Sequence, residues 1–213
     1  TNNSAWSGVA NKTHPDIVQF VHEEYIRAGV NVITANTFST CRHVLAGAGL
    51  DEETVEINRR AVQIAHRARD AAAHVQPVAV AGSMSNMVAW KEGTTSPDLK
   101  YFPTPEQEVS NYREMAETLA ESGVDVILLE MMLDIERASR AMAAAVATGL
   151  PVWVGISCSQ HADGRMVGWD IANETAITTN YVPPDPLPLD QIISSLRKMG
   201  GQVFGIMHSS LNS

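Results

Sequence analysis

Apolar residues follow two alternating patterns along the chain, a helical period and short continuous runs. The segment His14–Ala28 places its apolar side chains on one helical face, with Pro15 in the position of a first turn and Gly29 in that of a C-terminal cap. The run Val30–Phe38 follows directly and is rich in β-branched residues, which are typical of a strand. The chain therefore opens with a predicted helix and a predicted strand.

This helix-and-strand unit recurs along the rest of the chain. The further predicted helices are Asp51–Ala73, Pro103–Ser122, Asp134–Thr148 and Leu189–Met199, and the further predicted strands are Val75–Ala81, Val124–Leu129, Leu150–Ile156 and Gln202–Met207. Near-continuous apolar strands are buried on both faces, which indicates a parallel sheet covered by helices. No G-x-G-x-x-G or G-x-x-x-x-G-K-[ST] motif follows a predicted strand, which argues against a nucleotide-binding open sheet. We therefore predict an α/β fold of the (β/α)8 TIM-barrel type, with this chain supplying about five to six of the eight units.

The predicted barrel forms a single domain over residues 1–213. A complete barrel takes about 250 residues, and the chain opens at Thr1 without Met, so we expect the first strand and the last one or two units to lie outside this sequence. Two long segments, Met84–Phe102 and Ser159–Pro188, follow predicted strands and contain Gly, Pro and aromatic residues. Long loops at the carboxyl ends of barrel strands usually shape a binding site, although a disordered insertion also fits the end of the second segment.

Composition narrows the classes of partner. The chain is 45% hydrophobic, which suits a globular domain, and 15 basic against 24 acidic residues give a net charge of −9 without any Lys/Arg run. Nucleic acid and anionic membranes are therefore not expected as partners. Cys41 and Cys158 make no disulfide framework, which is typical of a reducing compartment and favours the cytoplasm. No apolar run approaches the roughly 18 to 20 residues of a membrane span.

Polar residues gather where the predicted strands end, which is where a barrel of this type carries its chemistry. These residues are Asn36, Thr37, Ser83, Glu130, Ser157, Cys158, His208 and Ser209. Glu130 is the most informative, because a carboxylate directly after an apolar strand is partly desolvated and needs a cationic or hydrogen-bond-donating partner. A substrate ammonium would serve, and so would a structural salt bridge to an Arg or Lys.

The other strand-end residues each allow more than one role. Asn36 and Thr37 can hydrogen-bond a ligand or cap the next helix, and His208 can be a metal ligand, an acid–base group or a core histidine. The Cys158-x-x-His161 and Cys41-x-His43 pairs look like fragments of metal sites. Neither has a partner pair at the spacing of a zinc site, so the sequence does not support them as metal ligands.

Several segments together resemble the homocysteine S-methyltransferase family. The resemblance begins with Trp6-Ser7, His14-Pro15-Asp16-Ile17-Val18, His22, Tyr25 and the run Ala28–Phe38. It continues with Ala81-Gly82-Ser83, Pro105-Glu106, Ser122-Gly123-Val124-Asp125, Leu129-Glu130-Met131, Ser157, Asp163-Gly164 and Gly168. The similarity covers nearly the whole chain, and its most specific part is the end of the first predicted strand, up to Thr37-Phe38.

The resemblance implies a (β/α)8 barrel enzyme that transfers a methyl group to the thiol of homocysteine, giving methionine. The donor in such enzymes is a sulfonium compound, a betaine or a folate, and a zinc ion holds the acceptor sulfur as a thiolate, which stays nucleophilic at neutral pH. By this resemblance Glu130 would hold the substrate amino group and act in catalysis. Asn36 and Thr37, with Ser83 and Ser157, would bind the substrate in the same pocket.

The chain also departs from the family pattern at the zinc ligands. The family's first zinc cysteine lies in a G-V-N-C segment, and the matching residues here are Gly205-Ile206-Met207-His208, so a histidine replaces a cysteine. The family's other two zinc cysteines would follow Ser213. We therefore expect His208 to bind zinc, with further ligands outside this sequence.

Two alternatives accompany this expectation. One is a family member that acts on another methylated or thiol compound, with His208 as a zinc-free acid–base group. The other is a non-catalytic binding subunit. The expected partners are a small-molecule thiol and a methyl donor, and a homo-oligomeric assembly stays open.

Overall fold

A parallel sheet forms the centre of the protein. The computed structural model describes residues 4–72, 77–94, 96–132, 134–161, 163–168, 187–207 and 209. The five strands of the sheet are β1 (Val32–Thr34), β2 (Ala79–Ser85), β3 (Val126–Met132), β4 (Val152–Ile156) and β7 (Val203–Ile206). They lie side by side in the order β1-β2-β3-β4-β7, and every neighbouring pair is parallel. A separate antiparallel hairpin joins β5 (Cys158–Gln160) to β6 (Met166–Gly168).

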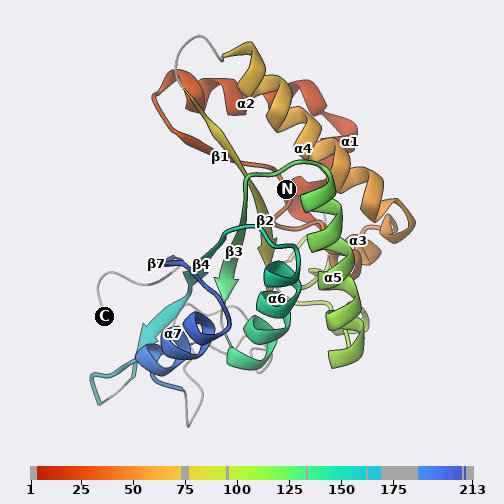
Figure 1. Ribbon diagram of the computed structural model, residues 1–213. Coiled ribbons are helices and arrows are strands. Elements are labelled where there is room, and N and C mark those ends of the chain that lie inside the picture. The colour runs from red at the N-terminus through yellow and green to blue at the C-terminus, as the bar shows by residue number, and fades with distance from the viewer. Residues whose placement is uncertain are drawn as a thin grey trace.

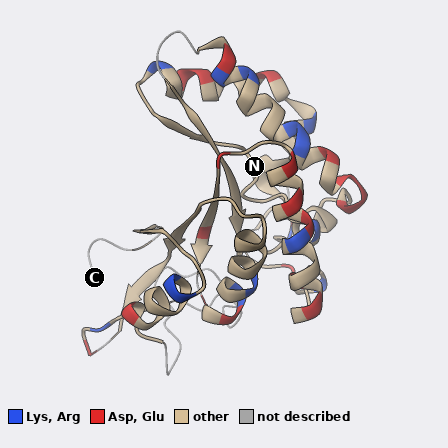
Figure 2. Cartoon of the chain, viewed as in Figure 1, with Lys and Arg blue, Asp and Glu red and all other residues tan. Residues whose placement is uncertain are grey.

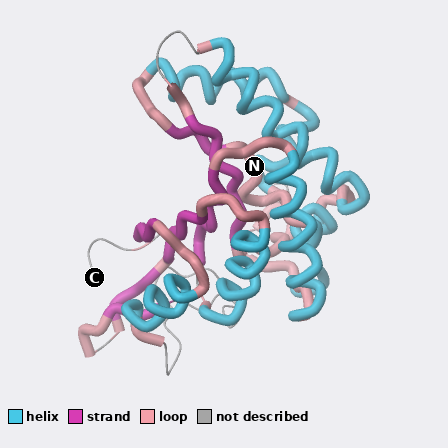
Figure 3. The backbone as a smooth tube through the Cα atoms, viewed as in Figure 1, coloured by secondary structure: helices cyan, strands magenta, loops and turns pink. Residues whose placement is uncertain are grey.

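The longer helices cover one side of this sheet, and no described helix covers the other side (Figures 1 and 3). The longer helices are α2 (Pro15–Arg27), α4 (Thr54–Ala71), α5 (Pro105–Glu121), α6 (Ile135–Ala147) and α7 (Leu189–Lys198). The shorter ones are η1 (Trp6–Val9), α1 (Ala10–Thr13), α3 (Arg42–Gly47), η2 (Asp51–Glu53) and η3 (Leu99–Tyr101). Because the sheet curves away from the helices, the described chain has the form of a half-barrel with a concave inner face. No described helix has the length and the apolar character needed to cross a membrane.

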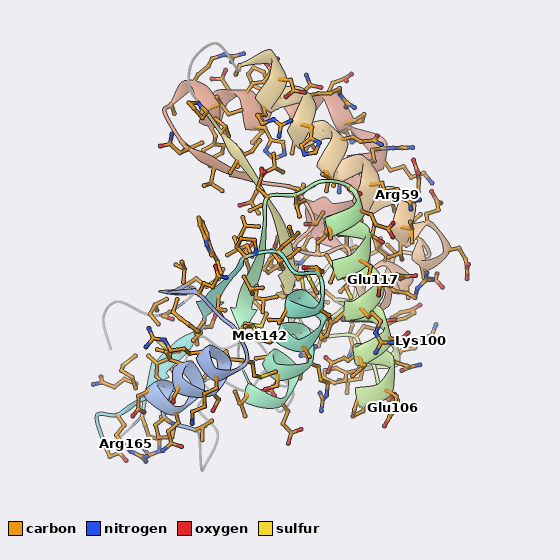
Figure 4. All side chains as sticks on the ribbon, in the orientation of Figure 1. Arg59, Lys100, Glu106, Glu117, Met142 and Arg165 are labelled. Carbon is orange, nitrogen blue, oxygen red and sulfur yellow. The ribbon has the colours of Figure 1, made fainter. Side chains whose placement is uncertain are left out.

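The core lies between the helices and the convex side of the sheet. Tyr112 and Leu119 of α5 pack there with Ile127 and Leu129 of β3, and all four are fully buried. In Figure 4 the labelled charged side chains on α4 and α5 lie on the outer side of the helical layer, whereas Met142 of α6 is enclosed. The packed core on the convex side therefore stabilises the fold, and the residues of the concave face are available for binding and catalysis.

Local sequence signals set the helix starts at the carboxyl ends of the strands. Thr104 and Gln107 form a complete capping box at the start of α5, and Pro105 occupies the first turn. Asp134 caps α6 by accepting the backbone N–H groups of Glu136 and Arg137 at 2.9 Å. These caps fix where each helix leaves the rim of the half-barrel.

The predicted alternation of helices and parallel strands is confirmed, with differences at the element ends. The strands β2 and β3 run on to Ser85 and Met132, beyond the predicted ends at Ala81 and Leu129. The first strand is shorter than predicted, since β1 covers only Val32–Thr34. Helix α3 and the β5–β6 hairpin were not predicted, and the hairpin occupies the start of the segment expected to be a loop. Five units of a barrel are present in the described residues, and a closed eight-stranded barrel is not.

Charge is distributed unevenly over the two faces. Lys, Arg, Asp and Glu side chains lie along the helices, whereas the strands are almost free of them (Figure 2). Within the described strands, Glu130 of β3 is the one charged residue. The next residue, Met131, has a left-handed φ of 55°, and the pairing of β3 with β4 is irregular between Leu129 and Met132. A non-glycine residue in this conformation is strained, and such strain gathers at functional sites.

Candidate functional site

The concave face is lined by alternate residues of each strand. Gly82 of β2 faces the helical layer, since a Cβ at this position would lie 3.2 Å from side-chain atoms of Leu119 and Val124. Its neighbour Ser83 therefore faces the concave side. Ser85 is the register partner of Glu130, so Glu130 faces the same side as Ser83 and Ser85. The sheet thus brings a carboxylate and two hydroxyl groups to one face near the carboxyl ends of the strands.

A direct hydrogen bond joins two of the predicted site residues. The hydroxyl group of Ser83 donates to Oε1 of Glu130 at 2.5 Å, from the neighbouring strand. Glu130 is partly buried and Ser83 is fully buried. A hydrogen bond to an ionised carboxylate is short and strong, so this contact restrains the direction of the Glu130 side chain.

Thr37 ties the end of β1 to β2. Its hydroxyl group donates to the backbone oxygen of Ser83 at 2.8 Å and accepts the backbone N–H of Ser83 at 3.0 Å. Thr37 is fully buried. The two bonds replace a rung of the sheet ladder beyond the end of β1, and they use the hydroxyl group of Thr37 within the protein. If Thr37 contacts a substrate, it therefore does so through atoms other than its hydroxyl group.

Asn36 is held by the N-terminal segment. Its Nδ2 donates to the backbone oxygen of Ser7 at 2.8 Å and to Oδ1 of Asn11 at 3.0 Å. Its Oδ1 accepts from the hydroxyl group of Ser7 at 3.1 Å. The side chain of Asn36 thus has a fixed orientation, and its carbonyl oxygen has room for one more donor. Ser7 and Asn11 were not among the predicted site residues, although Ser7 lies in the Trp6-Ser7 motif.

A cavity of about 720 Å³ lies between α2 and β1 and reaches this group of residues. Asn36 and Glu130 both line it, together with Thr34 and Ser7, and the rest of its wall is mostly apolar side chains of α2 and β1. An apolar cavity with a few convergent polar groups is typical of a small-molecule site. The structure therefore places the predicted residues Asn36 and Glu130 in one cavity, with Thr37 and Ser83 directly behind them.

Aromatic side chains lie beside the same rim. Trp6 stacks on Phe38 with ring centroids 6.2 Å apart and meets the edge of Trp90 at 4.9 Å. Phe38 lines the cavity, and Trp6 has a left-handed φ of 47°, which is strained for a bulky residue. Long-range packing brings these residues together, and the sequence held no signal for their contact.

Ser157, at the end of β4, is not among the residues that line this cavity. It is fully buried, and its backbone N–H donates to the backbone oxygen of Met132 at 3.1 Å. Its hydroxyl group has no hydrogen-bond partner among the described residues. A buried hydroxyl without a partner is costly, which keeps Ser157 a candidate for ligand contact. His208, the predicted catalytic and metal-binding residue, lies outside the described residues.

The described residues by themselves do not fit a zinc ion. No group of three or more His, Cys, Asp or Glu side chains within them is placed to hold a metal. Besides Glu130, the described wall of the cavity offers hydroxyl and amide oxygens and the single imidazole of His22, whereas thiol-activating zinc is held largely by several sulfur and nitrogen ligands. Burial raises the pKa of the Cys41 thiol to about 12, so this group is not a thiolate at neutral pH. The Sγ atom of Cys158 lies 3.4 Å from the hydroxyl group of Ser209.

The fold and the site together define an α/β chain of the (β/α)-barrel class of enzymes, seen here as a half-barrel with a polar cavity at the carboxyl ends of its strands. A sequence model of the homocysteine S-methyltransferase family matches residues 1–186. The chain belongs to this family, which consists of methyltransferase enzymes.

Solved structures of the homocysteine methyltransferase MmuM from Escherichia coli share the fold. The metallated form aligns with a TM-score of 0.68 and 20% identity over 96% of this chain and 67% of that chain. The oxidized form gives a TM-score of 0.70 and 21% identity over 96% and 66%, and the apo form gives 0.61 and 19% over 96% and 65%. The chain thus spans about two thirds of the length of these structures.

Proposed function

We propose that the protein transfers a methyl group to the thiol of homocysteine or a closely related amino-acid thiol, giving methionine or its analogue. In this reaction the sulfur attacks the methyl carbon, an S–C bond forms, the bond between the methyl group and the donor breaks, and the thiol proton is lost. The observation that carries the proposal is the position of Glu130. In a chain of this family, Glu130 presents to the cavity the one carboxylate that the described strands carry.

The substrate would be held by its charged amino group. A partly buried carboxylate such as Glu130, the one charged residue of the described strands, attracts an ammonium group strongly, because solvent screens the pair little. With the amino group at Glu130, the side chain of the thiol extends along the concave face and its sulfur is held in one place relative to the donor. Asn36 and Ser157 are proposed as further substrate contacts, and Thr37 as a residue that shapes the wall of the pocket.

The proposed donors are a sulfonium compound, a betaine or a folate. The ring of Phe38, which lines the cavity and carries Trp6 stacked on it, favours the first two, because ring faces attract cationic groups. A zinc ion, with His208 among its ligands, belongs to the proposal through the family, and when bound it would keep the acceptor thiol ionised. The proposed location is the cytoplasm, and a homo-oligomeric assembly is compatible with the proposal.

The variant Glu130→Gln tests the proposal. We expect kcat/KM for homocysteine to fall by about 30- to 100-fold, as expected for the loss of a charge-assisted contact with the substrate. Methionine formation from homocysteine and each donor class is the measurement, with zinc supplied. Glu117→Gln on the outer side of α5 (Figure 4) is the matched control and should leave the rate unchanged. Unchanged turnover in Glu130→Gln would refute the proposed role of Glu130.

A further inference from the structure

We propose that Ser83 is a positioning residue: its hydroxyl group aims the Glu130 carboxylate at the ammonium group of the substrate and does not itself contact the substrate. This inference rests on the proposed function and deepens it. It begins from the short hydrogen bond between the Ser83 hydroxyl and Oε1 of Glu130, which links strands β2 and β3 across the concave face.

Ser83 is well suited to act as a fixed anchor. Its side chain is fully buried, and β2 lies in the sheet with β1 on one side and β3 on the other. The hydroxyl group of Thr37 holds both backbone groups of Ser83, at 2.8 and 3.0 Å. Ser83 is also absent from the cavity wall, where Glu130 is present. The carboxylate of Glu130 therefore faces the cavity, whereas the hydroxyl group of Ser83 lies behind it and holds it in place.

Glu130 needs such an anchor because its own strand is irregular there. The register of β3 against β4 is broken between Leu129 and Met132, and Met131 has the left-handed φ of 55°. A glutamate side chain has three rotatable bonds, and a carboxylate must be oriented before it can select a ligand by direction. The Ser83 hydroxyl restrains this freedom by its hydrogen bond to Oε1 of the carboxylate.

The consequence is a specificity role for Ser83. Only substrates that carry an amino group use the Glu130 carboxylate, so loss of the anchor should weaken their binding selectively. A matched thiol without the amino group, 4-mercaptobutanoate, should be affected far less. Ser83 would thus contribute to the preference for an amino-acid thiol over a simple thiol acid.

The test compares Ser83→Ala with Ser85→Ala. Ser85 lies on the same strand and face and is also buried, but its hydroxyl group donates to the backbone oxygen of Phe38 at 2.6 Å. We expect Ser83→Ala to raise KM for homocysteine about 10-fold or more with a smaller change in kcat, and to change kcat/KM for 4-mercaptobutanoate less than threefold. Ser85→Ala should leave the ratio of the two substrates unchanged. Urea unfolding of both variants checks that each is folded.

A double variant separates positioning from a merely structural effect. Because Ser83 acts through Glu130, adding Ser83→Ala to Glu130→Gln should change KM for homocysteine less than twofold. An equal loss for both thiols in Ser83→Ala, or an unchanged ratio, would overturn the positioning role alone. A wild-type protein that neither binds nor methylates homocysteine would overturn the proposed function, and the inference with it.

Discussion

The buried ion pair between α5 and α6 gives the sharpest prediction about stability. Glu108 of α5 accepts from Nε of Arg137 at 2.5 Å, and the two side chains are only 2% and 5% exposed. Arg140, which is 22% exposed, donates to the other carboxylate oxygen of Glu108 at 2.7 Å. Both Nη atoms of Arg137 have no hydrogen-bond partner among the described residues, and its guanidinium lies 5.2 Å from the ring centre of Phe102. Arg137 therefore depends on Glu108 for its neutralisation.

The variants Glu108→Gln and Arg137→Met should differ in cost. Glu108→Gln leaves a buried guanidinium without its hydrogen-bonded carboxylate, and since Arg cannot lose its proton, we expect a loss of about 3 to 5 kcal/mol in the free energy of unfolding. Arg137→Met leaves Glu108 with Arg140 as a partner, so its cost should be smaller, about 2 kcal/mol. The double variant should cost less than the sum of the two, because the charges are removed together.

Urea denaturation followed by circular dichroism measures these differences, with an unchanged slope as the check for two-state unfolding. Glu136→Gln is the control, because Glu136 is 79% exposed and pairs with the same Arg140 at 3.3 Å. Its cost should be below about 1 kcal/mol. The reasoning would be refuted by a loss below about 1 kcal/mol in Glu108→Gln, or by a larger loss in Arg137→Met than in Glu108→Gln.

Two further predictions concern pH and packing. Burial lowers the pKa of His43 from 6.5 to about 4, so the unfolded chain binds the proton first as pH falls, and stability should drop between about pH 6.5 and 4. Wild type should lose about 2 kcal/mol more than His43→Gln between pH 7 and pH 5 in urea unfolding, and parallel curves would contradict this origin. A Cβ on Gly47 would lie 2.6 Å from Cβ of Ala89, so Gly47→Ala should cost about 1 to 3 kcal/mol. Gly205→Ala, where a Cβ meets no atom within 4 Å, should not lower the thermal midpoint, and an equal loss in both would refute the packing argument.

The sequence predicted the alternation of elements well because each helix and strand carries its own local signal. Helix α5 was expected over Pro103–Ser122 and is found over Pro105–Glu121, since Thr104 caps it with its own side chain. The apolar strand β4, expected over Leu150–Ile156, covers Val152–Ile156. Helix caps and apolar runs depend on residues that are close together in the chain, so they can be recognised directly in the sequence.

The contacts within the site could not be predicted in the same way. Ser83 and Glu130 meet across 47 positions of sequence, and their contact depends on the register of β2 with β3. Likewise, the first strand ends early because the side chains of Asn36 and Thr37 bind groups outside β1. The sequence was enough to name the polar residues at the strand ends. The register of the strands was needed to tell which of these residues face the cavity and which of them hold the others in place. The assigned site roles, including that of His208, remain predictions.

Apart from Glu130, the charged residues that the structure describes lie on helices and loops, which separates the electrostatics of the two faces of the half-barrel. Charged side chains on the outer helices act over about one Debye length, roughly 8 Å at physiological salt, and beyond that distance solvent ions screen them. Among the residues of the described strands, Glu130 alone places a charge on the concave face. Evolution or an engineer can therefore change the net charge of the exterior, and with it solubility and colloidal behaviour, while the selectivity of the interior stays as it is.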